Sequence, residues 1–268
     1  MTLDRRSLIA GGVAATLFSG SPVKAQTPWE EWRDLTNYLP DQAALEALRT
    51  GRGRPPLVWE VQRIESAQKP TLNLDKYEIR ISSLPTSGPG AGGAQNLYDA
   101  IRNNFGSFFD SSIAEFRPHI ATDGTEWTQS SVPPLGGMHL FGIKAWGLEL
   151  ERGAVVLSGA TNMSWRFSTV TIGSIIVGTH PVAGNREFLL QANGDGSHSF
   201  IIRAADRAYD HTPTEATVLD GAKDCWRAFQ GRLVAFVNSG GGSAQALAPI
   251  VMAPAWSDAV ANGLFTRA

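Results

Sequence analysis

The chain has 268 residues, of which 43% are hydrophobic, and its 23 basic and 25 acidic residues give a formal charge of −2. Such a balance argues against a protein that binds nucleic acid or an anionic membrane through a basic surface. The single cysteine, Cys225, excludes an intramolecular disulfide, so the hydrophobic core has to stabilise the fold.

The amino terminus shows the three parts of an export signal. Arg5 and Arg6 form a positive segment, an apolar run covers residues 8–18, and Val23-Lys24-Ala25 provides a small-residue cleavage site. A membrane-spanning helix needs about 20 apolar residues, so this glycine-diluted run is too short to span a bilayer. We therefore expect residues 1–25 to be a signal peptide that is removed on export.

The sequence Arg5-Arg6-Ser7-Leu8-Ile9 resembles the twin-arginine signal, in which two arginines precede two apolar residues. Asp4 departs from that signal's usual Ser or Thr, and its usual following Lys is missing. The resemblance implies that the protein folds in the cytoplasm before it crosses the membrane and that the export machinery is a partner. We expect a mature protein of residues 26–268 that forms one domain, has no membrane segment and is periplasmic or secreted in a bacterium.

The first part of the mature sequence predicts helices, then strands, then another helix. Apolar residues recur at helical spacing from Trp29 to Leu48, and Asp41 can cap the second piece after the interruption at Pro40. Strands are predicted over residues 57–64 and 72–81, a Ser/Pro/Gly-rich loop over 82–93, and a helix over 97–109 that breaks at Gly106.

The middle of the chain is rich in β-branched and aromatic residues and predicts a sheet. Asn193-Gly194-Asp195-Gly196 favours a hairpin turn, because Asn and Gly accept a positive φ at little cost. A helix over 222–237 follows, with its apolar residues on one face, and the tail from residue 243 shows no firm periodicity. Strands are predicted over 139–150, 155–158, 164–171, 174–178, 187–191 and 199–203.

These elements together predict an α+β fold. We expect a mostly antiparallel, bent β-sheet over residues 57–204, flanked by amino- and carboxy-terminal helices.

Two patterns resemble cofactor or metal sites, and neither is favoured. Residues 88–93 have the spacing G-x-G-x-x-G, but the strand before them is charged rather than apolar, so a surface loop without a nucleotide cofactor is the better interpretation. Asp206, Asp210 and His211 are close enough in sequence to begin a divalent-metal site on a helix. Arginines 203 and 207 on the same turn instead favour a helix start with ion pairs, and we expect no metal.

The stretch 179–188 is the candidate catalytic segment. It is predicted to be a loop between two strands, and loops on a rigid sheet often carry functional groups. His180 could act as an acid–base group and Arg186 could bind an anion, with Asp206 as a third group, in a hydrolase of an ester or phosphate. The alternative is a Pro-Gly turn whose polar residues face water, with Arg186 paired to an acid. Cys225 is expected to be a packing residue.

Aromatic residues favour ligand binding over catalysis. Rings in the predicted strands and on the late helix could line a pocket for an apolar molecule, or could simply fill the core. The leading hypothesis is therefore an exported protein that binds a small apolar ligand between sheet and late helix. The alternatives are the hydrolase and a structural or partner-binding module, and the question of enzyme activity stays open. The candidate ligand-binding residues are Trp146, Trp165, Phe188 and Trp226.

Overall fold

The computed structural model describes residues 28–145, 148–173, 178–209 and 215–267. The expected signal peptide and the residues Trp146, Asp210 and His211 lie outside the described residues. Most of the predicted strand 174–178 does so too.

Short helices open the described chain, as the periodicity predicts. The 3-10 helix η1 (Glu30–Trp32) leads into α1 (Arg33–Asn37), and α2 (Gln42–Gly51) follows after Pro40. The Asp41 carboxylate accepts a hydrogen bond from the Ala44 backbone N–H at 3.0 Å, so the predicted cap of α2 is confirmed.

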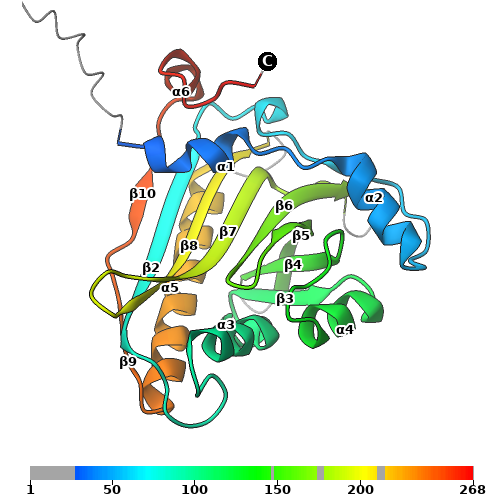
Figure 1. Cartoon of the computed structure of the whole chain (residues 1–268). Helices are drawn as coiled ribbons and strands as arrows, with labels where there is room; N and C mark the ends of the chain where they lie inside the picture. The colour runs from blue at the N-terminus through cyan, green and yellow to red at the C-terminus, as the bar shows by residue number, and fades with distance from the viewer. Residues whose placement is uncertain (1–27, 146–147, 174–177, 210–214, 268) are drawn as a thin grey trace, which may run out of the picture.

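A single antiparallel sheet runs through the described residues (Figure 1). Its strands follow the order β10-β2-β8-β7-β6-β5-β4-β3, with β9 beside β2 and β1 beside β6. Register shifts in β2, β4 and β5 mark bulges, which bend strands and increase their twist. The strands are β1 (Trp59–Val61), β2 (Asn73–Ser83), β3 (Ala114–Pro118), β4 (Met138–Ala145), β5 (Leu148–Ala160), β6 (Ser164–Ile172), β7 (Val182–Ala192), β8 (His198–Ala208), β9 (Ser243–Ala246) and β10 (Ile250–Met252).

Helices cover the concave face of this sheet. The long helix α5 (Glu215–Ser239) lies along β2 and β8, and α3 and α4 close the end that carries β3 and β4 (Figure 1). The main core lies between these layers and is built around the ring of Phe105. The remaining helices are η2 (Ile64–Ser66), α3 (Ala94–Asn103), η3 (Phe105–Phe108), α4 (Ala121–Gln129) and α6 (Trp256–Ala261).

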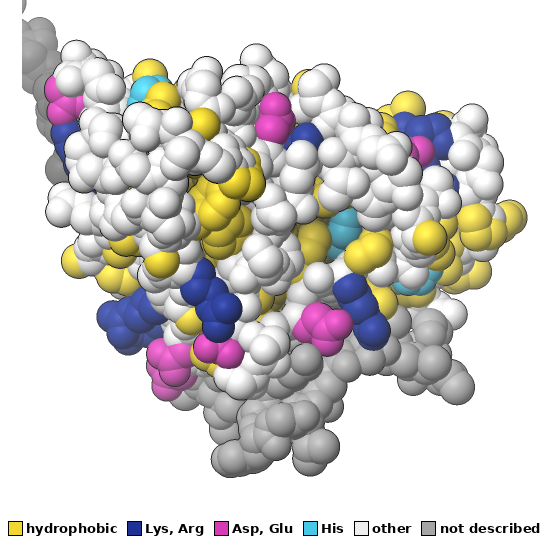
Figure 2. Space-filling model, turned by 90° about the horizontal axis from the view of Figure 1, so that it is seen from below, with side chains coloured by type: hydrophobic (Ala, Val, Ile, Leu, Met, Phe, Trp, Pro, Cys, Tyr) yellow, Lys and Arg dark blue, Asp and Glu magenta, His cyan; other side chains and the backbone are white. Residues whose placement is uncertain are grey.

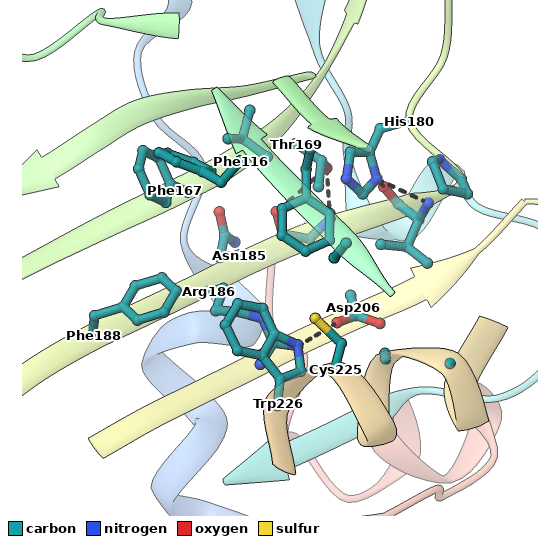
Figure 3. A pocket seen from close by; sticks show the side chains of 18 of the residues that line it. Phe116, Phe167, Thr169, His180, Asn185, Arg186, Phe188, Asp206, Cys225 and Trp226 are labelled. Atoms are coloured by element: carbon teal, nitrogen blue, oxygen red, sulfur yellow. Dashed lines mark hydrogen bonds and ion pairs between the residues drawn. The ribbon is translucent and has the colours of Figure 1, made fainter. Parts of the chain in front are cut away.

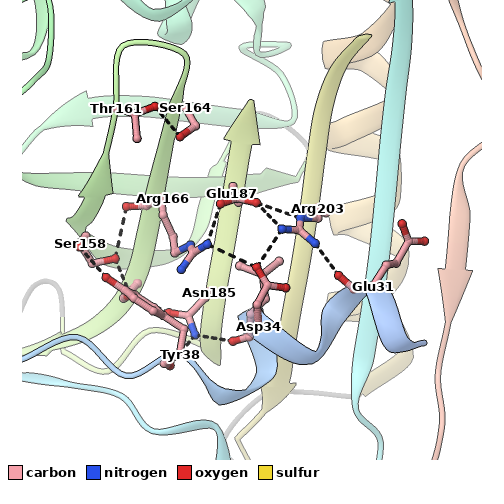
Figure 4. Close-up of polar contacts among 12 residues, drawn as sticks. Glu31, Asp34, Tyr38, Ser158, Thr161, Ser164, Arg166, Asn185, Glu187 and Arg203 are labelled. Carbon is pink, nitrogen blue, oxygen red and sulfur yellow. Dashed lines mark hydrogen bonds and ion pairs between the residues drawn. The ribbon is translucent and has the colours of Figure 1, made fainter. Parts of the chain in front are cut away.

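The amino-terminal helices pack on the convex face. Glu187 of β7 accepts hydrogen bonds from Arg166 of β6 and Arg203 of β8, each at 2.6 Å, and Arg203 also pairs with Asp34 of α1 at 2.9 Å (Figure 4). The Asn185 amide donates to the backbone carbonyls of Leu35 and Tyr38. This polar network fixes α1 on the sheet.

The predicted α+β class with a bent antiparallel sheet is confirmed, and three details of the prediction are wrong. Residues 182–186 were expected to lie in a loop but belong to β7, because the pairing with β6 and β8 outweighs the local Pro-Gly signal. Asp206 was expected on a helix but lies in β8, where it pairs with Asn73. Arg203 therefore pairs with Glu187 and Asp34 rather than with its sequence neighbours.

The third error concerns helix placement. The helix predicted over residues 97–109 is present as α3 and η3, but α4 was not predicted, because its sequence has no strong apolar periodicity. The apparently featureless tail forms β9, β10 and α6. None of the helices in the described part of the chain is long and apolar enough to cross a membrane.

Candidate functional site

A cavity of about 110 Å³ lies between the concave face of the sheet and α5 (Figure 3). Strands β3 to β8, η3 and the first turns of α5 supply its walls. Most of the lining is apolar, and six aromatic rings form the greater part of it: Phe105, Phe116, Phe141, Phe167, Phe188 and Trp226.

The rings of the walls are held by one another. Phe105 contacts Phe116 and Phe188 edge to face, with ring centroids 4.8 and 5.0 Å apart. Trp165 stacks on Phe188 at 4.9 Å and is fully buried, but it stands behind that ring and does not line the cavity. Such edge-to-face and stacked pairs fix ring orientation, so the walls are preformed.

At one end of the cavity, called its floor here, the inward-facing residues of β2, β7 and β8 change from apolar to charged. Along β2 the inward positions run from Ile81 through Ile79 and Tyr77 to Asp75, and β8 ends the same way at Asp206. A period of two therefore brings carboxylates onto the concave face.

Cross-strand register places the two carboxylates around Arg186. Asp75 and Arg186 both pair with Ala204, on either side of β8, and the small alanine side chain leaves room between them. The guanidinium group of Arg186 donates to both oxygens of Asp75, each at 2.8 Å. One pair further along the two strands, Asp206 of β8 lies opposite Gly184 of β7. A Cβ atom at position 184 would come within 2.6 Å of the Asp206 Cβ.

Arg186 is held on a second side by Trp226 of α5. Its guanidinium carbon lies 4.4 Å from the centre of the indole ring, in a cation–π contact (Figure 3). The contact joins helix to sheet at the floor of the cavity.

Asp206 is the less neutralised of the two carboxylates. Its Oδ2 lies 3.8 Å from Arg186 Nη2, and the Asn73 amide donates to it at 3.3 Å. Burial, together with the neighbouring charge of Asp75, raises the pKa of Asp206 to about 7, although Arg186 and Asn73 oppose the shift. At neutral pH this carboxyl is therefore partly protonated.

His180 borders the cavity just before β7. Its ring packs on the backbone of Gly153, and a Cβ atom at position 153 would come within 2.0 Å of the imidazole ring. The Nδ1 atom of His180 is hydrogen-bonded to the backbone of Val182. Gln62 fixes the His180 backbone through a pair of hydrogen bonds. Burial lowers the pKa of His180 to about 4, so the ring is neutral at pH 7.

The Cys225 thiol and the Thr169 hydroxyl also line the cavity, and neither is activated as a nucleophile. Burial raises the pKa of the Cys225 thiol to about 12, which keeps it protonated. The Thr169 hydroxyl accepts a hydrogen bond from the Gly184 backbone N–H at 3.0 Å. In the part of the chain that the structure describes, no group of three His, Cys, Asp or Glu side chains is arranged to hold a metal.

The structure thus brings together most of the residues that the sequence singled out. His180, Arg186 and Asp206, proposed as catalytic, and Phe188 and Trp226, proposed for ligand binding, all line the cavity. Asp75 was missed, although it occupies an inward position of an alternating strand. The signal that could have revealed it is a charged residue at an alternate position of the strand whose other members, Tyr77, Ile79 and Ile81, are apolar. The aromatic residues Phe105 and Phe116 of the walls were not singled out as part of a site either.

Seen from the end that carries α3 and α4, charged side chains of both signs are scattered, and apolar side chains show in recesses between them (Figure 2).

No protein-family model and no curated protein matches this sequence. Among solved structures, the chain shows a weak likeness to the one titled "Crystal structure of Ara h 8.0201", with a TM-score of 0.35 and 10% sequence identity. The alignment covers 60% of this chain and 99% of that chain.

Proposed function

We propose that this protein binds a small, largely apolar molecule in the cavity between sheet and α5. The observation that carries the proposal is a preformed space walled by six aromatic rings and bordered by a few polar groups, the usual composition of a ligand pocket. Its volume of about 110 Å³ approaches that of engineered apolar cavities, of roughly 150 Å³, that bind benzene. A ligand, or the buried part of one, about the size of a single aromatic ring fits this space.

The geometry favours binding over the hydrolase alternative. An ester or phosphate hydrolase would need Arg186 to hold an anionic group, but its guanidinium already makes a bidentate pair with Asp75. His180 is bonded to the backbone, and the Cys225 thiol stays protonated. The partner-binding alternative has little support, because the large apolar side chains exposed in the described part of the chain are spread over separate elements, apart from two neighbours on β10.

The cavity proposal predicts that a larger side chain at Ala222 excludes ligand. Ala222 lines the cavity from α5, so Ala222→Leu places three extra carbons in the ligand space. Overpacking of this kind costs about 1–3 kcal/mol, which is an affinity loss of roughly five- to 150-fold. Binding of toluene to the purified protein, followed by ligand-observed NMR, measures the effect.

Ala235→Leu is the matched control, since Ala235 is exposed on the same helix. It is expected to bind toluene like the wild type. Native mass spectrometry of the purified protein should also reveal any molecule that remains bound. Unchanged toluene binding by Ala222→Leu would contradict the proposed site, and the absence of toluene binding by the wild type would contradict the function.

We propose further that residues 1–25 direct export and are then removed, so that the mature protein acts in the periplasm or outside the cell. The support is the order of paired arginines, short apolar run and cleavage site in the sequence.

A further inference from the structure

The floor of the cavity carries one more negative group than positive groups. Asp206 and Arg186 line it, and Asp75 is joined to them through its ion pair with Arg186; no other lysine or arginine is among the described residues that line the cavity. With both carboxyls ionised, the buried cluster has a net charge of −1. Because an uncompensated buried charge is costly, a proton or another cation has to balance it.

Asp206 is the carboxyl that lacks a full partner. Asp75 receives both hydrogen bonds of the Arg186 fork and an additional contact from Asn73 at 3.2 Å. Asp206 has only the 3.8 Å approach of Arg186 and the shared Asn73 amide, yet it is 92% buried and lines the cavity. A ligand in the cavity therefore reaches the underneutralised carboxyl directly.

The other titratable groups around Asp206 do not supply the missing charge. On β2, burial and the neighbouring Asp75 raise the pKa of Tyr77, so its phenol stays neutral. On α5, burial keeps the Cys225 thiol protonated. Near the start of β7, burial keeps His180 neutral at pH 7, and Arg186 is the single cation among the described residues that line the cavity. The raised pKa of Asp206, about 7, fits a carboxyl that holds a proton in place of a cationic partner.

We propose that the cavity selects apolar amines, whose ammonium group pairs with Asp206 while the hydrocarbon part lies among the aromatic rings. This inference rests on the proposed ligand-binding function and names its ligand class. An ammonium group replaces the proton on Asp206 and brings the cluster to neutrality, whereas an anionic ligand adds a third negative charge. The ring faces of the walls also attract cations.

The size of the cavity suggests three probes of one shape. Benzylamine, benzyl alcohol and benzoate each carry one aromatic ring and differ in the charge of their polar group. Isothermal titration calorimetry with the purified wild-type protein at pH 6 and pH 8 brackets the pKa of about 7. At pH 8, benzylamine is expected to bind at least about tenfold more tightly than benzyl alcohol, with benzoate weakest, because buried charge pairs need full compensation.

The preference for benzylamine should shrink at pH 6, where Asp206 is protonated and binding of the ammonium has to displace that proton. Titrations at pH 7 in two buffers of different ionisation enthalpy count the protons released, and a fraction of a proton per benzylamine is expected. This measurement needs no variant.

Asp206→Asn keeps the shape of the site and removes its charge. The variant is expected to lose the preference for benzylamine, so that it binds benzylamine and benzyl alcohol with similar affinities. If the wild-type protein binds benzyl alcohol well but benzylamine no better, or if it releases no proton on binding benzylamine, the amine proposal is overturned while the cavity proposal stands. If none of the three compounds binds, the proposed function itself fails.

Discussion

Asp206 shows how one residue links the fold to the chemistry of the site. Its position in β8 follows from strand register, and its burial follows from the packing of α5 over the sheet. The raised pKa, about 7, means that the folded protein holds a proton there that the unfolded chain releases at a much lower pH. Stability from this group is therefore fully present below the unfolded pKa and is lost as the pH rises through 7.

We predict that Asp206→Asn stabilises the protein in alkaline solution. Because each pKa unit corresponds to about 1.4 kcal/mol, ionising Asp206 in the folded protein costs up to about 4 kcal/mol, and the amide avoids this cost. The free energy of unfolding, measured in urea at pH 5 and pH 8, should favour the variant more at pH 8.

The control is Asp195→Asn in the exposed hairpin turn. Hydrogen bonds from Ser197 lower the pKa of Asp195, so its carboxylate is favoured in the folded state and its removal brings no gain at pH 8. An Asp206→Asn variant whose advantage is equal at both pH values would show that Asp206 is ionised throughout.

At the scale of elements, the central strands serve both faces of the sheet. β7 alternates between Arg186 and Phe188, which face the cavity, and Asn185 and Glu187, which fix α1 on the convex side. Burial opposes ionisation of Glu187, but the guanidinium groups of Arg166 and Arg203 outweigh it and lower its pKa. The contribution of Glu187 to stability is thus present at neutral pH and lost in acid.

We predict that Glu187→Gln destabilises the protein by about 2 kcal/mol, because two largely buried guanidinium groups lose their shared carboxylate. Urea unfolding at pH 7 measures the change. Glu31→Gln, which removes a more exposed pair with Lys76, should cost less than about 1 kcal/mol. Equal losses for the two variants would mean that the network around Glu187 contributes no more than a surface pair.

At the scale of the whole molecule, one sheet has packed cores on both faces. The concave side holds the main aromatic cluster, and smaller clusters lie under α1 and α6 and under α2. The only cysteine is buried and unpaired, so the fold is complete without an oxidising compartment.

We predict that replacing Arg5 and Arg6 by lysine leaves the precursor in the cytoplasm. Lysines preserve the positive charge that an ordinary secretory signal needs, but a receptor that reads paired arginines no longer recognises the signal. Cell fractionation with amino-terminal sequencing of the exported protein, expected to begin at Gln26, measures the outcome. Normal export of the lysine variant would indicate the ordinary route, and wild-type protein that keeps Met1 in the cytoplasm would contradict export altogether.

The sequence by itself determined those features that depend on neighbouring residues. Periodicities of two and of 3.6 residues identified β2, the β7–β8 hairpin and α5, because each pattern reflects one face of one element. It also selected His180, Arg186 and Asp206 as chemically notable, although it assigned Asp206 to a helix.

Only the tertiary structure decided what these residues do together. Asp75 and Arg186 are 111 positions apart, and their pairing depends on both strands flanking the small Ala204. Likewise, a cavity exists where α5 and the bent sheet leave space between aromatic rings, and no local pattern records the distance between two packed layers. Local sequence encodes which side of an element is apolar, whereas packing between distant elements sets the burial that shifts a pKa and creates a binding site.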